Sequence, residues 1–188
     1  MFIALTGLHR AGKSHFLKNV PHKYGFTVLD KKQLLAYICK TETGRDDYAV
    51  WYAEEFNRDP YAMVKKMVDY IPTDQNIVLD AVHSNVEWYI LKELVPNAKL
   101  MLVTALKEDR QERWDRVETE DLDKKDAKRI GFWHSDNPNL PCLLTDVSWT
   151  INGSGSIELI DLSFKELVGR MMELEEKPKI LKRGKKNG

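Results

Sequence analysis

One stretch near the start of the chain restricts its possible folds more than any other. Residues 7–14 read Gly-Leu-His-Arg-Ala-Gly-Lys-Ser. A glycine, four unrestricted residues and then Gly-Lys-Ser/Thr is the pattern of a phosphate-binding loop. Such a loop needs a strand before it and a helix after it. The apolar run 2–6 predicts a buried strand, and residues 14–20 predict a helix that ends at Pro21.

Each position of this loop has an expected physical role. Gly7 permits the turn, and Gly12 lets the main chain approach a phosphate without a Cβ in the way. Lys13 is expected to reach the β- and γ-phosphates and the Ser14 hydroxyl to bind Mg²⁺, while the following helix adds its N-terminal dipole. The remaining positions are expected to bind through main-chain N–H groups. The sequence thus predicts ATP and Mg²⁺ as ligands, with ATP held by Gly7, Leu8, His9, Arg10, Ala11, Gly12, Lys13 and Ser14.

The rest of the chain alternates between apolar runs and helical patterns. Further strands are predicted at residues 26–30, 76–80, 99–104 and 147–151. This alternation predicts an α/β fold of three layers, with a five-stranded parallel sheet and helices on both faces. Ligands of such sheets bind at the carboxyl ends of the strands. Two capping boxes, Ser84/Glu87 and Ser163/Glu166, are expected to begin helices.

Composition limits the class of protein. The 188 residues fit one domain, 1–176, followed by a basic tail, 177–188, which is expected either to be a flexible, solvated end or to touch nucleic acid. Lysine plus arginine and aspartate plus glutamate number 29 each, so no overall charge indicates a nucleic-acid or membrane partner. The two cysteines are too few for a disulfide framework. With no signal peptide and no long apolar run, a cytoplasmic protein is expected.

Two acidic residues end predicted strands and are candidates for the site. Asp80 is placed to hold Mg²⁺ together with Ser14, although a strand-end turn residue is the simpler alternative. Asp30 is a candidate to accept a proton from an acceptor hydroxyl, or to cap the helix that follows it. The two roles of Asp30 are compatible.

Residues 41–75 differ from the rest in composition, because aromatic and charged residues interleave and no strand is predicted. We expect one or two helices here, forming a substrate lobe beside the loop. The candidate substrate contacts are Arg45, Trp51, Tyr52 and Arg58. A nucleobase would stack on Trp51 or Tyr52, while a helical core is the alternative explanation for the same aromatics.

The overall layout resembles the small P-loop kinases of the nucleoside-monophosphate-kinase and dephospho-coenzyme-A-kinase group. Residues 80–84, Asp-Ala-Val-His-Ser, are similar to the group's Asp-Gly-x-Arg-Ser, with His83 at the arginine position. Residues 110–114 resemble the arginine-bearing helix that begins the lid, here 107–140. Residues 151–154 resemble the adenine-side loop. The resemblance implies that Arg113 is catalytic, that Arg110, Asn152 and Gly153 contact ATP, and that His83 contacts substrate. A solvated helix face is the alternative for the arginines.

The expected activity is a Mg²⁺-dependent transfer of the ATP γ-phosphate. The expected acceptor is a hydroxyl or phosphate of a small nucleotide or nucleoside-like molecule, with Lys13, Asp30 and Arg113 as catalytic residues. The absence of an Asn-Lys-x-Asp pattern counts against a GTPase. Two alternatives stay open: a kinase acting on a modified-base hydroxyl in DNA, and a nucleotide-binding module without catalysis. The sequence predicts no oligomeric state.

Overall fold

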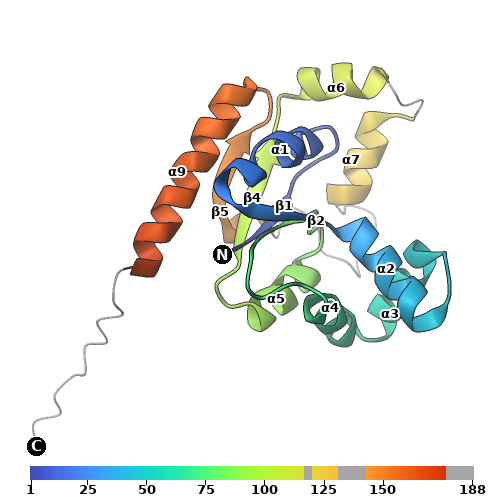
Figure 1. The fold of residues 1–188 in the computed structure, drawn as a ribbon. Helices are drawn as coiled ribbons and strands as arrows, with labels where there is room; N and C mark the ends of the chain where they lie inside the picture. The colour runs from blue at the N-terminus through green and yellow to red at the C-terminus, as the bar shows by residue number, and fades with distance from the viewer. Residues whose placement is uncertain (117–119, 131–142, 177–188) are drawn as a thin grey trace, which may run out of the picture.

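The computed structural model describes residues 1–116, 120–130 and 143–176. Its centre is a five-stranded sheet in the order β2-β3-β1-β4-β5, with every neighbouring pair parallel (Figure 1). The strands are β1 (Phe2–Thr6), β2 (Phe26–Asp30), β3 (Asn76–Asp80), β4 (Lys99–Thr104) and β5 (Val147–Asn152). The predicted parallel sheet is therefore confirmed, and β5 ends one residue later than expected.

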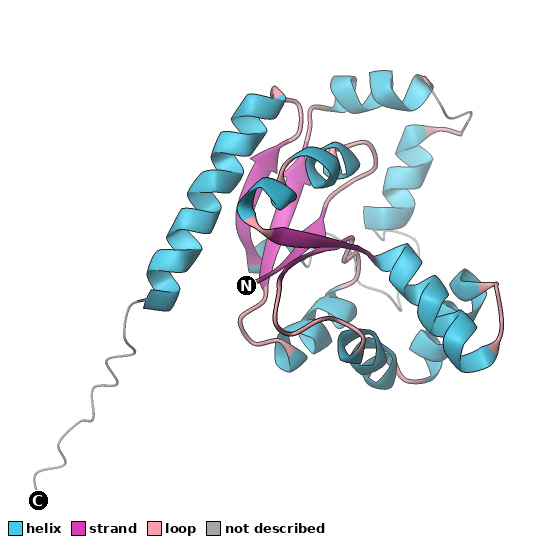
Figure 2. Ribbon diagram, in the orientation of Figure 1, coloured by secondary structure: helices cyan, strands magenta, loops and turns pink. Residues whose placement is uncertain are grey.

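Helices cover both faces of this sheet, as Figure 2 shows. In chain order they are α1 (Lys13–Asn19), η1 (Pro21–Tyr24), α2 (Lys31–Thr43), α3 (Tyr48–Arg58), α4 (Pro60–Asp69), α5 (Asn85–Leu94), α6 (Lys107–Asp115), α7 (Leu122–Ile130), η2 (Leu144–Asp146) and α9 (Ile157–Glu176). The expected helical character of 41–75 is confirmed by the end of α2 and by α3 and α4. The tail 177–188 lies outside the described residues.

The strand β1 shows why the chain forms three layers. All five of its residues are buried, and their side chains alternate between two cores. Phe2 and Ala4 pack with α2, α3, α4 and α5, whereas Ile3 and Leu5 pack with α1 and α9. An apolar strand that is buried on both faces requires helices on both faces.

Aromatic contacts hold α9 against the second face. Phe164 of α9 makes edge-to-face contacts with Phe16 of α1, Tyr24 of η1 and Phe26 of β2, at centroid distances of 5.1, 5.6 and 5.5 Å. Such pairs add to the free energy gained from burial alone. Phe164 therefore ties the last helix to the helix that follows the phosphate-binding loop.

The hydrogen bonds of the two predicted capping boxes are absent, although α5 does begin directly after Ser84 as predicted. Ser84 is the N-cap residue of α5 but makes no side-chain cap bond, and Glu87 is buried and forms an ion pair with Lys31. Helix α9 begins six residues before Ser163, and the main-chain N–H of Leu159 donates to Ser156 Oγ at 3.4 Å. Ser163 lies inside the helix and accepts a bond from Trp149 Nε1 at 3.3 Å. In both cases a tertiary contact uses a group that a local cap would need.

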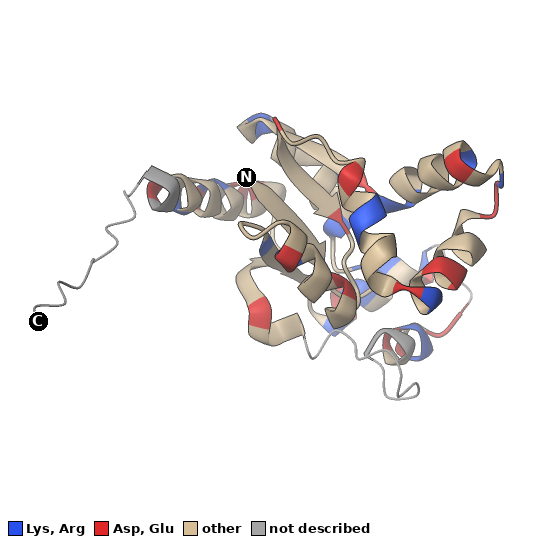
Figure 3. Ribbon diagram, turned by 90° about the horizontal axis from the view of Figure 1, so that it is seen from below, with Lys and Arg blue, Asp and Glu red and all other residues tan. Residues whose placement is uncertain are grey.

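Charged residues lie mainly on the helices and at strand ends, and the two signs are interspersed (Figure 3). Among the described residues, no helix has the length and apolar character needed to cross a membrane. The sheet order places β1 between β3 and β4: the chain goes from β1 to β2 and β3 on one side of it and then crosses to β4 and β5 on the other. This is the position at which open α/β sheets bind ligands.

Candidate functional site

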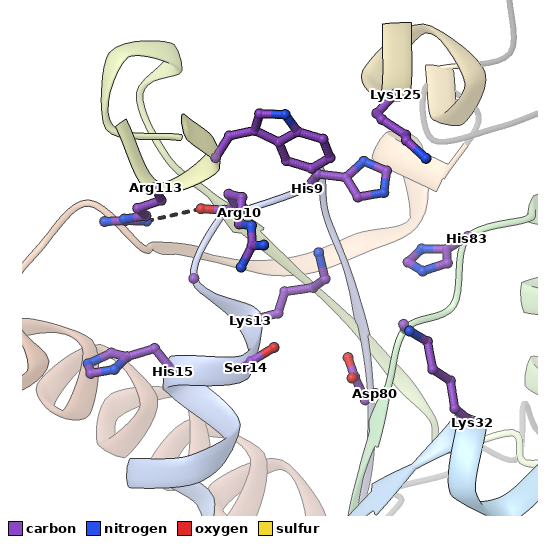
Figure 4. A pocket seen from close by; sticks show the side chains of 14 residues that line it. His9, Arg10, Lys13, Ser14, His15, Lys32, Asp80, His83, Arg113 and Lys125 are labelled. Atoms are coloured by element: carbon purple, nitrogen blue, oxygen red, sulfur yellow. Dashed lines mark hydrogen bonds between the residues drawn. The ribbon is translucent and has the colours of Figure 1, made fainter. Parts of the chain in front are cut away.

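A cavity of about 570 Å³ opens at the carboxyl ends of β1 and β3 (Figure 4). It is lined by most of the phosphate-binding loop, by the segment after β3 and by residues of α2, α6 and α7. The lining residues are His9, Arg10, Ala11, Gly12, Lys13, Ser14, His15, Lys32, Asp80, Ala81, His83, Arg113, Trp114 and Lys125. The location agrees with the site predicted from the loop motif.

Two glycines fix the shape of the loop. Gly7 has φ +141°, and a Cβ there would lie 2.3 Å from the Val103 carbonyl oxygen. Gly12 has φ +100° and is the residue directly before α1. Lys13 Nζ donates to the carbonyl oxygens of Gly7 and Leu8 at 2.9 and 2.7 Å. The lysine therefore lies across the loop, with its charge at the cavity.

The turn after β5 supports the loop from behind. Gly153 donates its N–H to the Thr104 carbonyl at 2.6 Å, and a Cβ on Gly153 would lie 1.8 Å from the Ala11 carbonyl oxygen. The Asn152 side chain accepts from the Ser154 N–H at 3.0 Å. Neither Asn152 nor Gly153 lines the cavity. Their predicted contact with ATP stays a prediction, while Gly153 packs directly against the loop main chain.

Ser14 and Asp80 are the predicted Mg²⁺ ligands, and both line the cavity. Figure 4 shows the Ser14 hydroxyl and the Asp80 carboxylate on the same side of Lys13, facing one another. Oxygen donors suit Mg²⁺, which usually keeps several waters and needs few protein ligands. In residues 1–116, 120–130 and 143–176, no group of three or more His, Cys, Asp or Glu side chains forms a metal site. The donor set thus fits Mg²⁺ bound partly by water and phosphate.

Arg110 and Arg113, both predicted to act at the ATP site, have different environments. Arg113 lines the cavity and donates to the carbonyl oxygens of Arg10 and Gly153, at 3.1 and 3.0 Å. Arg110 is only 6% exposed, and its Nη1 bonds to Asp126 at 2.6 Å and to the His9 carbonyl at 3.2 Å. The prediction of Arg110 as an ATP contact is corrected, since its guanidinium is turned into a buried ion pair.

Asp30 confirms its predicted capping role. Its Oδ1 accepts from the main-chain N–H groups of Lys32 and Gln33, at 2.8 and 3.2 Å. Asp30 lies opposite Asp80 in the β2–β3 register but is not among the residues that line the cavity. Its role as a proton acceptor stays a prediction.

The substrate contacts predicted in 45–58 lie away from the cavity. Trp51 is 2% exposed and packs in the core, and Tyr52 packs against that core, with burial and then Glu87 raising the pKa of its hydroxyl. Arg45 pairs with Asp47 and Glu54, at 2.7 and 2.9 Å. Arg58 is exposed and pairs with Glu55. The core interpretation is the correct one for the aromatics, and the arginines are engaged locally.

The structure brings His83 to the cavity, together with residues that sequence reasoning missed, and the predicted contact of His83 with substrate stays a prediction. Lys32 follows the Asp30 cap on α2, and Lys125 lies on α7, where it also pairs with Glu120. A buried pair of Lys31 with Glu87 stands behind them, and Lys31 Nζ also reaches the Ala81 carbonyl at 3.4 Å. No local pattern marks these lysines, because only the tertiary fold places them opposite the loop.

Comparison with solved structures finds the same fold in proteins of low sequence identity. TT1252 from Thermus thermophilus matches with a TM-score of 0.56 and 16% identity, over 90% of this chain and 97% of that one. Shikimate kinase from Aquifex aeolicus VF5 matches with a TM-score of 0.54 and 13% identity, over 93% and 98%. No protein-family model matches the chain, and neither does any curated protein sequence. This chain therefore has the fold found in P-loop kinases such as shikimate kinase, and the narrower predicted group is not shown.

Proposed function

We propose that this protein is a P-loop kinase that transfers the γ-phosphate of ATP to a small acceptor in the presence of Mg²⁺. The observation that carries the proposal is the loop geometry: Gly7 and Gly12 hold it open toward the cavity, and Lys13 lies across it. Phosphoryl transfer depends mainly on positioning and on neutralising charge. Both requirements are met by groups on this loop and by Arg113 beside it.

The roles of the residues follow from where their charges lie. The loop N–H groups and Lys13 would hold the donor phosphates, with Ser14 and Asp80 holding Mg²⁺. Bound Mg²⁺ would neutralise charge on the β- and γ-phosphates. Arg113 lines the cavity and bonds to the loop carbonyl of Arg10, and this position supports a role in which it would act on the transferred group as charge develops.

The opposite wall of the cavity indicates the class of acceptor. Lys32, His83 and Lys125 face the loop across the cavity, so an acceptor that carries a negative charge fits better than a neutral one. A small nucleotide meets this condition, and so does a hydroxy acid of the kind named for the shikimate kinase structure. The acceptor therefore presents a hydroxyl or phosphate together with an anionic group.

The two alternative functions, a kinase with a DNA acceptor and a nucleotide-binding module without catalysis, differ in how much still supports them. The aromatic residues that suggested a platform for a DNA base belong to the core, so only the tail 177–188, outside the described residues, still favours a DNA acceptor. A nucleotide-binding module without catalysis would show ATP binding and no acceptor-dependent turnover. One experiment distinguishes both alternatives from the proposed kinase activity.

That experiment is an acceptor screen by coupled ADP detection. The panel contains mononucleotides, nucleosides, dephospho-coenzyme A, shikimate and hydroxymethylated DNA, each with and without Mg²⁺. We expect ADP release that needs one small anionic acceptor and Mg²⁺, and that falls by about 10² to 10³-fold in Lys13→Ala. Unchanged activity in that variant would refute the role of the loop. Turnover with DNA alone would replace the small-acceptor proposal.

A further inference from the structure

The side chain of His9 is the feature that the proposed function leaves unexplained. A phosphate-binding loop uses main-chain N–H groups at this position, so its side chain is unrestricted. Here the imidazole is 29% exposed and lines the cavity, while its other surroundings are built from buried groups. Figure 4 places His9 with His83 and Lys125 around the same part of the cavity, beyond Lys13.

A buried carboxylate is aimed at one nitrogen of this ring. Asp126 of α7 is 5% exposed, and its Oδ1 lies 3.5 Å from His9 Nδ1. A buried carboxylate is costly unless it is paired. The second oxygen, Oδ2, pairs with Arg110 at 2.6 Å. Asp126 is thus held by α6 while its other oxygen faces the loop histidine.

Two further contacts fix the position of His9, one to its imidazole ring and one to its main-chain carbonyl. Trp114 of α6 makes an edge-to-face contact with the imidazole, at a centroid distance of 5.8 Å and an interplanar angle of 75°. Arg110, which holds Asp126, donates to the His9 carbonyl as well, at 3.2 Å. One arginine therefore positions both the carboxylate and the loop residue that it faces.

A carboxylate at Nδ1 favours the tautomer with the proton on Nδ1, which leaves the lone pair on Nε2. His9 Nδ1 is buried while the side chain as a whole is 29% exposed and lines the cavity, so the cavity reaches the ring elsewhere than at Nδ1. Resting on the proposed kinase function, we propose that His9 is the general base for the acceptor hydroxyl. Asp126 and Arg110 are its positioning residues.

The step balances in the following way. The acceptor O–H gives its proton to His9 Nε2, and its oxygen forms a bond to the γ-phosphorus. The bond from the γ-phosphorus to the β–γ bridging oxygen breaks, and its electron pair stays on the β-phosphate of ADP. The imidazolium then lies beside the Asp126 carboxylate, which stabilises its charge. This assignment moves the proton acceptor from Asp30, which caps α2, to a side chain that lines the cavity.

Other charged groups around the cavity also act on the titration of His9. They are Lys125 of α7, Arg113 of α6, Lys32 of α2, Arg10 and Lys13 of the loop, and Asp80 and His83 after β3, together with the buried Asp126–Arg110 pair outside the cavity lining. The cationic groups lower the pKa of an imidazole and the carboxylates raise it. Removing the Asp126 charge therefore has a defined direction: the pKa of His9 falls.

The test measures single-turnover phosphoryl transfer against pH, with the best hydroxyl acceptor from the screen, beside calorimetric binding of Mg²⁺-ATP. In His9→Gln we expect binding within about threefold of wild type and transfer slower by about 10² to 10⁴-fold, without the acidic limb of the pH profile. In Asp126→Asn that limb is expected at lower pH. His22→Gln, on the exposed η1, is the matched control and keeps the wild-type profile.

Three results would overturn the assignment. The first is a His9→Gln enzyme with wild-type transfer rate and pH profile. The second is weaker ATP binding in His9→Gln with an unchanged transfer step, which would make His9 a phosphate contact. The third is loss of the acidic limb in Asp30→Asn, which retains a good cap residue, but not in His9→Gln. If wild type transfers phosphate to no acceptor, the proposed function fails instead, and the two failures are distinguishable.

Discussion

The two walls of the cavity are built from different kinds of groups. The loop wall, residues 9–14, is one continuous stretch of main chain whose position depends on close backbone approaches at Gly7, Gly12 and Gly153. The opposite wall, formed by Lys32, His83 and Lys125, presents side chains from three separate elements. A loop that binds through its backbone must keep its glycines, whereas a wall of side chains can be rebuilt by single substitutions. We therefore propose that the loop wall sets the reaction and that the opposite wall sets the acceptor.

Arg113 of α6 lies beside the loop wall, and its removal should have the largest effect among the substitutions that compare the two walls. Arg113→Ala is expected to slow turnover by about 10²-fold with ATP affinity changed much less, because its charge would act mainly in the transition state. Steady-state kinetics and calorimetry measure the two effects. Arg116→Ala is the matched control, since Arg116 is 68% exposed and pairs with Glu112 on the surface. Equal effects in the two variants would contradict the assignment.

Gly153 tests whether the loop depends on backbone packing from behind. Gly153→Ala is expected to weaken Mg²⁺-ATP binding by about tenfold and to lower the free energy of unfolding by about 1–3 kcal/mol, since its Cβ would clash with the Ala11 carbonyl. Calorimetry and urea denaturation give the two values. Gly169→Ala, where a Cβ meets nothing within 4 Å, should instead raise stability by about 0.5–1 kcal/mol. Normal ATP binding in Gly153→Ala would show that the support is dispensable.

Substitutions in the opposite wall should change the KM for the acceptor rather than the KM for ATP. Lys32→Ala and Lys125→Ala are each expected to raise the KM for the acceptor by about two- to tenfold, with the KM for ATP nearly unchanged. Initial rates at varied acceptor and varied ATP separate the two. Lys18→Ala, an exposed residue of α1 outside the cavity lining, serves as the control. A larger effect on ATP than on the acceptor would reverse the assignment of the two walls.

Arg45 is expected to have the smallest effect, because it lies in the loop before α3 and bonds to Asp47 and Glu54. Arg45→Ala should leave the KM of the acceptor unchanged. The Arg45 guanidinium lowers the pKa of Asp47, so this pair stabilises the fold above about pH 4 and the contribution is lost as pH falls through the lowered value. Denaturation at pH 7 and pH 3 should show a small stability difference from wild type at pH 7 that becomes smaller at pH 3. A raised KM for the acceptor would show that Arg45 contributes to acceptor binding.

The parts of the molecule that follow local rules could be predicted from sequence. The five strands and the loop are examples, since short apolar runs and the Gly-x₄-Gly-Lys-Ser spacing leave a direct trace in the residues. Groups whose partners are distant in sequence could not be predicted. Glu87 looked like a capping residue but pairs with Lys31, and Arg110 looked like a nucleotide contact but pairs with Asp126. For Trp51 and Tyr52 the sequence favoured a helical core and left a stacking platform open, and the packing of α2, α3 and α4 decides for the core.

The claim on which the whole account depends is that the loop binds a nucleoside triphosphate with Mg²⁺. Isothermal titration calorimetry of the full chain with ATP, with and without Mg²⁺, tests it most directly, with Lys13→Ala measured beside wild type. We predict saturable binding at one site that strengthens with Mg²⁺ and weakens by at least about tenfold in the variant. Heats that show no Mg²⁺-dependent uptake of ATP, GTP, CTP or UTP by a folded wild-type protein would contradict the account.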